Sequence, residues 1–185
     1  MSGRIPRPTR RFQPRQPQPQ RPLYLQVKPA PAAASRIAAL PRNDPGRGAE
    51  LLHMTVFALV DLAEWSEDFI PMFHRTMEGF DAGVFDVQFD RIVERQAVTL
   101  RASKRQKGAQ ALQWLLRAHF EARDFRFFGA APDPHVTINY KADGKGNEAI
   151  SPIGWTVEDI ILVESVYGET RHVEHGRWPL RPRLL

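Results

Sequence analysis

The sequence predicts an α+β domain in which helices pack on the outside of antiparallel sheets. Short apolar runs with strand character alternate with a few segments of helical periodicity. The second half of the chain contains mainly strand-like segments, which favours this class over a regular alternation of strands and helices. A length of 185 residues is enough for one domain with its own core.

The first 22 residues differ in composition from the rest of the chain. They contain six arginines and no acidic residue, and they mix Pro and Gln with almost nothing apolar. Such a composition cannot offset the entropy lost on folding, so we expect residues 1–22 to be a disordered extension. The alternative interpretation is an electrostatic arm for RNA. The remaining residues, 23–185, are expected to form a single domain of two lobes.

The overall charge belongs mostly to this extension. The formal net charge is +5, but without the six arginines the chain carries 20 basic and 21 acidic residues. Cysteine is absent, which excludes disulfides, thiol nucleophiles and Cys-ligated metals and fits a reducing cytoplasm. No apolar run approaches the roughly 18 residues that cross a bilayer. We therefore expect a soluble, cytoplasmic monomer that does not associate with membranes.

The first half of the ordered chain predicts two strands and two helices. The run 23–27 is apolar and β-prone, and 32–40 is rich in helix-forming residues before a Pro- and Gly-containing loop. The run 51–62 is almost continuously apolar, which predicts a strand buried on both faces. Ser66 is the expected N-cap of a second helix, which Gly79 ends.

The middle of the chain predicts a β-hairpin followed by a helix. Segments 83–92 and 97–102 alternate in polarity, which predicts two strands joined by a short turn. A basic stretch then leads into a helix with an apolar stripe. The predicted members of this stripe are Leu112, Leu115, Leu116 and Phe120.

The last third of the chain predicts three strands. Segment 135–140 follows a Pro-Asp-Pro turn, and the composition of 143–147 predicts a polar loop. Segment 160–166 is strongly β-branched, and 172–180 is expected to be the closing strand.

Two of the predicted strands carry the same short motif. His53 and Thr55 lie two positions apart, and His135 and Thr137 repeat this spacing 82 positions later. Because side chains alternate along a strand, the His and Thr of each motif share one face. Two such strands would present two imidazoles and two hydroxyls to one cleft between two pseudo-equivalent lobes. These groups suit phosphoester chemistry without a metal.

The remaining histidines carry weaker signals. His172 and His175 have the spacing of a metal-binding pair, but in a strand they would face opposite sides, and no third ligand is evident. We interpret them as exposed edge residues. His74 and His119 lie in predicted helices and are expected to be surface or packing residues. A single His in an apolar strand is also usually a core residue, so the repetition of the motif is what indicates function.

The paired motifs resemble those of the two-histidine (2H) phosphoesterases, which include bacterial 2′-5′ RNA ligases and RNA 2′,3′-cyclic phosphodiesterases. Both motifs are flanked by apolar residues, and Pro134 precedes the second. The segments 22–25 and 178–180 are similar to the first and closing strands of that family. The resemblance covers residues 23–180 and implies its fold, in which two lobes of antiparallel sheet with outer helices surround a central cleft. Asn139-Tyr140-Lys141 departs from the family, which often has an Arg after the second motif.

The resemblance also implies an activity. It is metal-independent hydrolysis of 2′,3′-cyclic phosphate ends of RNA or nucleotides to a 2′-phosphate, with 2′-5′ RNA ligation as the reverse reaction. His53 would be the general acid and His135 the general base, and the opposite assignment stays open. Thr55 and Thr137 would donate hydrogen bonds to phosphate oxygens. No metal and no cofactor are expected.

Four further residues are candidates for contacts with the substrate. Tyr24, Phe128 and Tyr140 are aromatic residues that would stack on a base, and Lys141 would line a rim that binds the nucleic-acid backbone. The alternative is that the aromatic residues belong to the core and the lysine to a solvated loop. Two other functions also remain open. One is a non-catalytic RNA-binding module that keeps the cleft, and the other is a phosphodiesterase for a small nucleotide such as ADP-ribose cyclic phosphate.

Overall fold

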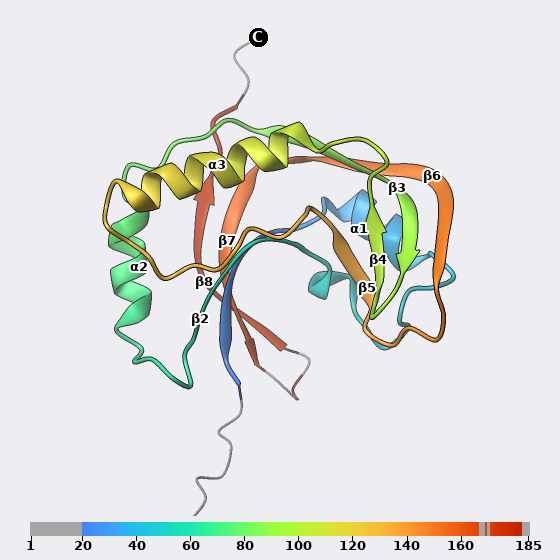
Figure 1. Ribbon diagram of the computed structural model, residues 1–185, viewed down its shortest axis with the longest axis horizontal. Helices are drawn as coiled ribbons and strands as arrows, with labels where there is room; N and C mark the ends of the chain where they lie inside the picture. Colours follow the sequence, from blue (N-terminus) through green and yellow to red (C-terminus); the bar gives the residue numbers. More distant parts are fainter. Residues whose placement is uncertain (1–19, 167–168, 170, 183–185) are drawn as a thin grey trace, which may run out of the picture.

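The fold is an antiparallel sheet with helices packed against it, which confirms the predicted α+β class (Figure 1). The computed structural model describes residues 20–166, 169 and 171–182, and within these it contains eight strands and three α-helices. The strands are β1 (Pro22–Val27), β2 (Met54–Asp61), β3 (Phe85–Glu94), β4 (Val98–Arg101), β5 (Val136–Asn139), β6 (Gly146–Val157), β7 (Asp159–Val166) and β8 (Arg171–Pro179). The helices are α1 (Pro31–Ala38), α2 (Phe69–Met77) and α3 (Lys107–Glu121), with a short 3₁₀ helix, η1 (Ala49–Leu51).

The sheet consists of two halves of four strands each. The strand order is β6-β3-β4-β5-β2-β1-β7-β8, and β5 meets β2 through the single pair Met54 and Val136. We call the half with β2, β1, β7 and β8 lobe A and the other half lobe B. The two lobes match the predicted bilobal arrangement, but they do not correspond to the two halves of the sequence. Lobe A combines the first two strands of the chain with the last two.

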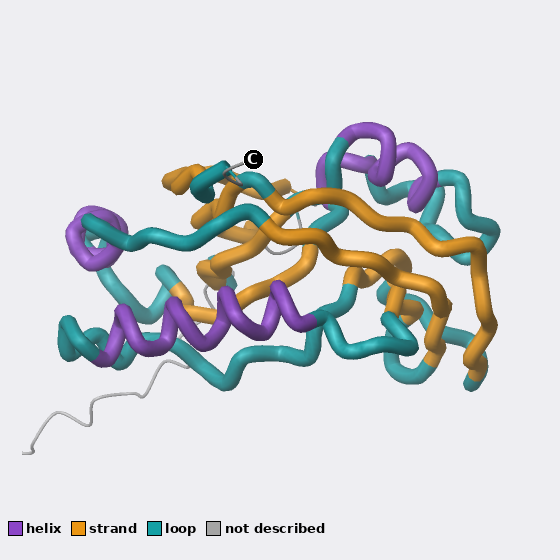
Figure 2. The backbone as a smooth tube through the Cα atoms, turned by 90° about the horizontal axis from the view of Figure 1, so that it is seen from above, coloured by secondary structure: helices purple, strands orange, loops and turns teal. Residues whose placement is uncertain are grey.

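The helices are divided between the lobes. Figure 2 shows α1 at the end of the molecule opposite to α2. Helix α1 packs against β6 of lobe B, where Arg36 donates a hydrogen bond to the carbonyl of Pro152 at 2.9 Å. Helix α3 runs from β3, where Gly108 packs closely on Phe85, to β2, where Gln113 donates a hydrogen bond to the carbonyl of Val56. It therefore ties lobe B to lobe A.

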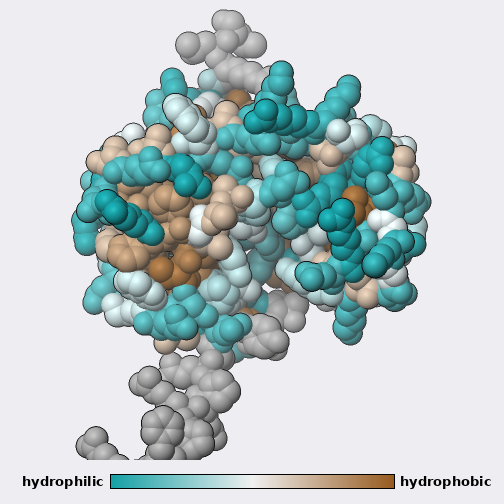
Figure 3. Space-filling view, viewed as in Figure 1, coloured by the Kyte–Doolittle hydropathy of each residue, from teal (hydrophilic) through white to brown (hydrophobic). Residues whose placement is uncertain are grey.

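A cluster of aromatic rings forms the core between lobe A and its helices. The rings of Phe57 in β2, Phe73 in α2 and Phe120 in α3 are fully buried, and the ring of Phe120 makes edge-to-face contacts with the other two at centroid distances of 6.0 and 5.9 Å. Phe125 and Phe128 extend this cluster. Aromatic pairs of this kind add to the stabilisation that burial itself provides. Apolar surface gathers on the same side of the molecule in the space-filling view (Figure 3).

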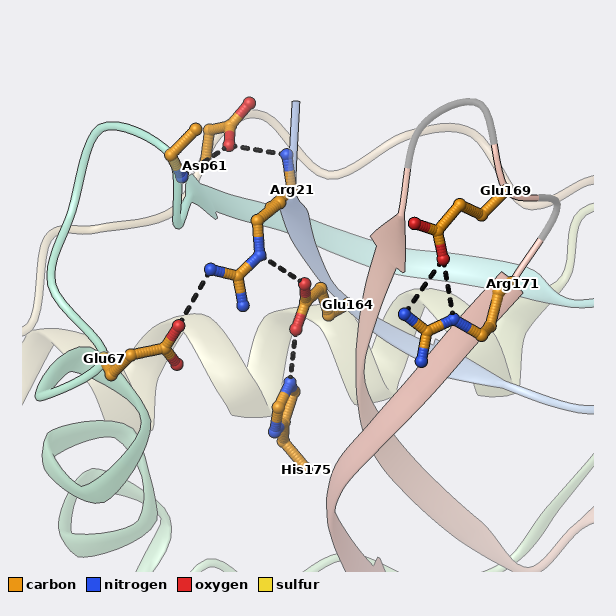
Figure 4. Close-up of polar contacts among 8 residues, drawn as sticks. Arg21, Asp61, Glu67, Glu164, Glu169, Arg171 and His175 are labelled. Carbon is orange, nitrogen blue, oxygen red and sulfur yellow. Dashed lines mark hydrogen bonds and ion pairs between the residues drawn. The ribbon is translucent and has the colours of Figure 1, made fainter. Parts of the chain in front are cut away.

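A buried ion-pair network holds the beginning of β1. Glu164 in β7 is 3% exposed and accepts hydrogen bonds from Arg21 Nε at 2.6 Å and from His175 Nε2 at 2.8 Å (Figure 4). Arg21 also pairs with Glu67 at 2.8 Å and donates its backbone N–H to Asp61. Burial acts to raise the pKa of Glu164, but the hydrogen bonds from Arg21 and His175 outweigh burial and lower it below its usual value.

This network corrects one boundary of the sequence-based division. Strand β1 begins at Pro22, and Arg21 is already held in ion pairs, so the ordered part starts before residue 23. Most of the predicted extension, residues 1–19, lies outside the described residues. Among the described residues, no helix has the length and apolarity that a membrane span requires.

Most predicted elements are confirmed, with shifted ends. The 51–62 strand begins only at Met54, after the turn of η1, and its second half is partly exposed rather than buried on both faces. Ser66 does not cap α2, which starts at Phe69 and has Asp68 as its N-cap. Gly79 follows the last turn of that helix with φ 69°, as the expected terminator does.

Two further predictions are wrong in part. Leu115 is 36% exposed, so the buried stripe of α3 consists of Ala109, Leu112, Leu116 and Phe120. The polar loop 143–147 overlaps the start of β6, a strand of 12 residues that the sequence analysis did not identify. Its N-terminal half is mostly exposed, and Pro152, which follows it, lies beside an irregularity in the pairing with β3. These features conceal the alternation that marks a strand.

Candidate active site

The two His-x-Thr motifs meet where lobe A joins lobe B. Met54 and Val136 are paired across β2 and β5, and both are buried. In an antiparallel register, this pairing sets His53 across from Thr137 and Thr55 across from His135. All four of these side chains are half-buried, on the face opposite to Met54 and Val136. The register therefore gathers the two motifs into one group of four polar side chains, with the histidines on one diagonal.

Both histidines are oriented by the same local contact. His53 Nδ1 lies 2.7 Å from the carbonyl oxygen of Leu51, and His135 Nδ1 lies 2.7 Å from that of Asp133. In each case the acceptor belongs to the residue two positions earlier. Because a carbonyl oxygen only accepts hydrogen bonds, Nδ1 carries the proton in the neutral ring. The Nε2 lone pair of each imidazole is then available to a ligand.

The environment of His53 disfavours its charged form. Burial lowers the pKa of His53 to about 4, although the hydrogen bond to Leu51 opposes this shift. The charge that His172 carries when protonated and the positive charges of Arg47 and Lys28 lower it further. At neutral pH His53 is therefore a neutral imidazole in the free protein.

The environment of His135 acts in the same direction. Burial lowers the pKa of His135, and the hydrogen bond to the Asp133 carbonyl opposes the shift. The nearby charge of Arg101 lowers the pKa further, whereas the carboxylate of Asp133 raises it. Since a bound phosphate would bring negative charge to both rings, it would favour the protonation of one of them.

The two threonines have hydroxyls available for a ligand. Among the described residues, no hydrogen bond to another residue is formed by the hydroxyl of Thr55 or of Thr137. Each hydroxyl lies beside a histidine of the opposite strand. The arrangement therefore combines two proton-transfer groups with two hydrogen-bond donors that can stabilise a negatively charged oxygen.

The structure adds three residues that the sequence analysis did not assign to the site. The ring of His172 in β8 lies 5.2 Å from the ring of His53 in an edge-to-face contact. Arg47 donates a hydrogen bond from Nη2 to the Leu51 carbonyl at 3.0 Å, the same oxygen that His53 contacts. Arg101 in β4 lies near His135 and pairs with Asp133.

No local sequence pattern pointed to these three residues, because strands and loops distant in sequence bring them to the motifs. His172 and His175 lie on the edge strand β8, as predicted, but the prediction that they are exposed is wrong, since both are partly buried. Their side chains have different environments, as the strand period suggests. His172 contacts the ring of His53, and His175 contacts Glu164.

Two of the predicted substrate-binding residues lie near this group. Tyr140 is 64% exposed, and the guanidinium of Arg47 lies 4.8 Å from the centre of its ring. Tyr24 is half-buried on β1. Burial raises the pKa of Tyr24, and the charges of Tyr140 and Asp61 raise it further. Tyr140 presents an open aromatic surface, whereas the ring of Tyr24 is less accessible.

The other two predicted residues are not brought to the histidines by any described contact. Phe128 packs against Phe57 and Phe120 in the aromatic core, with Arg117 over its ring. Lys141 is exposed, and its backbone N–H donates to the side chain of Asn139. Their roles in binding remain predictions. Within the described residues, no cluster of His, Asp and Glu has the arrangement of a metal site.

Comparisons with known proteins agree with this geometry. The model of the 2′-5′ RNA ligase superfamily matches residues 28–168, a range that includes both His-x-Thr motifs. The chain belongs to this superfamily. The resemblance to 2H phosphoesterases is thereby confirmed. No curated protein matches the sequence.

Solved structures share the fold of this superfamily member. E. coli LigT complexed with 3′-AMP is 20% identical, with a TM-score of 0.69 over 88% of this chain and 99% of its own. A structure described as a phosphoesterase is 19% identical, with a TM-score of 0.69 over 89% of this chain and 99% of its own. The protein TT0787 of Thermus thermophilus is 19% identical, with a TM-score of 0.64 over 88% of this chain and all of its own. At these identities the likeness concerns the fold.

Proposed function

We propose that this protein is a metal-independent phosphodiesterase that hydrolyses 2′,3′-cyclic phosphate ends of RNA or nucleotides to 2′-phosphates. The observation that carries the proposal is the matched pair of imidazoles at the junction of β2 and β5. Each has its Nδ1–H directed to a backbone carbonyl and a threonine across from it. Membership of the 2′-5′ RNA ligase superfamily supports the same chemistry. With a 5′-hydroxyl of a second RNA end attacking phosphorus in place of water, and O3′ leaving as before, the same groups would join RNA ends through a 2′-5′ bond.

The proposed reaction needs one proton acceptor and one proton donor. One imidazole takes a proton from water as the water oxygen bonds to phosphorus. The bond from phosphorus to the ribose O3′ breaks, and the second imidazole gives its proton to that oxygen. The phosphate remains on O2′ as a monoester. Each proton transfer typically contributes about 10²–10⁴-fold to the rate.

The threonine hydroxyls would act on the non-bridging oxygens of the phosphate. Negative charge accumulates on these oxygens as the fifth bond to phosphorus forms. Hydroxyls held in place before the reaction stabilise this charge with little reorganisation. Thr55 and Thr137 lie on different lobes, so the two hydroxyls would hold the phosphate from both sides.

The nucleoside would lie toward Tyr140. Its exposed ring offers a stacking surface for a base, with Arg47 on the ring and Lys141 next in the chain. Related structures support a nucleotide ligand, because E. coli LigT has been solved with 3′-AMP, with NADP+ and with ATP. A free nucleotide and an RNA end both contain the groups that these residues would bind.

The proposal is tested by incubating the protein with a panel of cyclic phosphates. The panel contains 2′,3′-cyclic AMP, an oligoribonucleotide ending in a 2′,3′-cyclic phosphate and ADP-ribose cyclic phosphate, and ³¹P NMR identifies the products. We expect turnover with 2′-phosphate as the product isomer. Tight binding of the oligonucleotide without turnover of any substrate would support an RNA-binding module instead. A 3′-phosphate product would show that the leaving oxygen is not O3′.

A further inference from the structure

Two cations lie together on the His53 side of the candidate active site. Lys28, which follows β1, donates a hydrogen bond from Nζ to the carbonyl of Glu50 at 2.9 Å. Arg47 donates from Nη2 to the next carbonyl, that of Leu51, at 3.0 Å. The same Leu51 oxygen contacts His53 Nδ1, so the guanidinium lies close to the imidazole. The fold therefore places two positive charges on neighbouring peptide groups at the edge of the site.

No carboxylate within the described residues neutralises these two charges. Neither Lys28 nor Arg47 takes part in an ion pair in that part of the chain. The carboxylate of Glu50 instead lies over Gly48, in the space where a Cβ atom would be. Each cation gives one N–H to a backbone carbonyl, whereas an ammonium has three N–H groups and a guanidinium has five. Both cations therefore keep further donors for a ligand.

Buried polar atoms near these cations also lack partners. Arg47 Nε and His172 Nδ1 are buried, and neither has a hydrogen-bond partner among the described residues. The ring of His172 lies 5.2 Å from that of His53. Burial lowers the pKa of His172 to about 4, and the charges of Lys28 and Arg47 lower it further, so the ring is neutral at pH 7. Unpartnered polar atoms beside two cations are explained if an anion binds here.

The cation beside His135, in contrast, is already paired. Arg101 Nη1 lies 2.8 Å from the carboxylate of Asp133, and Arg101 Nε donates to the hydroxyl of Thr99. The carboxylate offsets the attraction that Arg101 exerts on an anion. A second anionic group of a substrate is therefore attracted to the side of His53 rather than to the side of His135.

We propose that Lys28 and Arg47 form a second phosphate site beside the one that holds the cyclic phosphate. This inference rests on the proposed function and names its substrate class, which is a nucleoside 2′,3′-cyclic phosphate with a further phosphate on O5′. One ribose separates the two phosphates of such a substrate, so one site with two neighbouring parts can hold both. In RNA the second phosphate is the internucleotide diester, and in a free nucleotide it is a terminal monoester.

The contacts of Arg47 also fit the proposed position of the nucleoside. Its guanidinium lies 4.8 Å from the centre of the Tyr140 ring, which is the proposed stacking surface for the base. Arg47 therefore connects this ring with the Leu51 carbonyl beside His53. A nucleotide with its cyclic phosphate at His53 and its base at Tyr140 has the guanidinium within its span, where it can bind the phosphate on O5′.

Two substrates that differ only in the O5′ phosphate test the proposal. They are 2′,3′-cyclic AMP and its 5′-phosphorylated derivative, and kcat/KM is measured for both with the wild-type protein. We expect kcat/KM to be about 10–100-fold higher for the 5′-phosphorylated substrate, because hydrogen bonds between charged groups are strong. The gain should appear in KM, since the second phosphate takes no part in bond breaking. High salt should reduce the gain by screening the charges.

Substitution of either cation should weaken this preference. Lys28→Met and Arg47→Gln should each lower the ratio of the two kcat/KM values about tenfold. Lys107→Met, at the exposed start of α3, is the charge-matched control and should keep the wild-type ratio. Because the ratio compares two substrates of the same variant, effects on His53 or on the folded fraction cancel.

A dinucleotide that ends in a 2′,3′-cyclic phosphate identifies the source of the second phosphate. A gain with the dinucleotide as well as with the 5′-phosphorylated mononucleotide would assign the site to RNA ends, and a gain with the mononucleotide alone would assign it to free nucleotides. Equal kcat/KM for all three substrates in the wild type would overturn the second site, and so would a preference that both variants retain.

The second site can also fail or hold independently of the proposed function. If the wild-type protein hydrolyses none of these substrates, the proposed function fails, and calorimetry then tests the second site alone. Adenosine 3′,5′-bisphosphate should bind about 10–100-fold more tightly than 3′-AMP. Equal affinities for the two nucleotides would overturn the second site.

Discussion

His172 and His175 lie three positions apart on β8, yet the fold uses them in opposite ways. His175 donates to Glu164 in a network where Arg21 binds the second carboxylate oxygen. His172 lies against His53, and its Nδ1 is buried without a hydrogen-bond partner among the described residues. The first histidine completes a network of paired groups, and the second adds a buried polar atom without a partner. The same residue type on the same strand thus serves structure in one place and the candidate active site in the other.

The unpaired groups near the site have an energetic cost. Besides His172 Nδ1, the buried polar atoms without a partner include Arg47 Nε and both side-chain atoms of Gln26. Gln26 is the cross-strand neighbour of Thr55 on β1 and is fully buried. A buried polar group that lacks a partner costs about 1–3 kcal/mol. Such costs concentrate where a protein keeps groups available for a ligand, whereas the Glu164 network leaves none of its charges unpaired.

The largest expected effect is on catalytic activity, and it distinguishes the candidate active site from the Glu164 network. His135→Ala should lower kcat/KM for 2′,3′-cyclic AMP by about 10²–10⁴-fold, because a proton-transfer group is lost. His175→Ala should leave kcat/KM unchanged when both are assayed well below their unfolding temperatures. A comparable loss of kcat/KM in His175→Ala would show that the Glu164 network belongs to the active site.

The next effect concerns the hydroxyls. Thr55→Val and Thr137→Val keep the side-chain shape but remove a donor to the phosphate, so kcat should fall by about 10²-fold in each. Because neither hydroxyl has a protein partner in the described part of the chain, the melting temperature should not fall. An unchanged kcat in both variants would exclude the threonines from phosphate stabilisation.

Substitutions in the ion-pair network of Glu164 should lower stability rather than activity. Arg21→Ala leaves the buried carboxylate of Glu164 with only His175, so the free energy of unfolding should fall by about 1–3 kcal/mol. Urea unfolding measures this change. The matched control is Arg126→Ala, whose pair with Asp124 is exposed and should contribute little. Equal effects of the two substitutions would contradict a stabilising role for the network.

The last expected effect is a dependence of stability on pH. Burial lowers the pKa of both His53 and His172 from 6.5 to about 4. The unfolded chain therefore binds more protons below pH 6.5, so the stability of the free protein should be highest above pH 6.5 and should fall toward pH 4. His172→Phe removes one of the two groups, so the free energy of unfolding should depend less steeply on pH. Urea unfolding between pH 7 and pH 4.5 measures this dependence. A steeper dependence in the variant would contradict the expectation.

The sequence alone predicts the two His-x-Thr motifs of the site but not the residues that surround them in the fold. The two His-x-Thr motifs are visible because a strand repeats every two residues, so His53 with Thr55 and His135 with Thr137 could be assigned to shared faces. Arg47 and His172 could not be found in this way. They reach His53 through a loop and through β8, and such long-range contacts leave no periodic signal in a single sequence.

The same reason explains the errors in the fold. The sequence does not reveal strand β6 because its first half is mostly exposed and Pro152 follows directly after that half, so the strand lacks the alternation of a half-buried strand. Phe128 packs against the aromatic core, and its role at the substrate stays a prediction, since only tertiary structure decides which face an aromatic residue occupies. The interleaved lobes also depend on pairing between β1 and β7, which are far apart in the chain.

The most direct test of the account is ¹⁵N NMR of the imidazoles at pH 7, because their ¹⁵N shifts show which nitrogen carries the proton. We expect His53 and His135 to be neutral and protonated on Nδ1, as their 2.7 Å contacts with Leu51 and Asp133 require. Addition of 3′-AMP should then shift the Nε2 signals of both rings together. Protonation on Nε2 in either free ring, or no response of either ring to 3′-AMP, would contradict a paired site at the junction of β2 and β5.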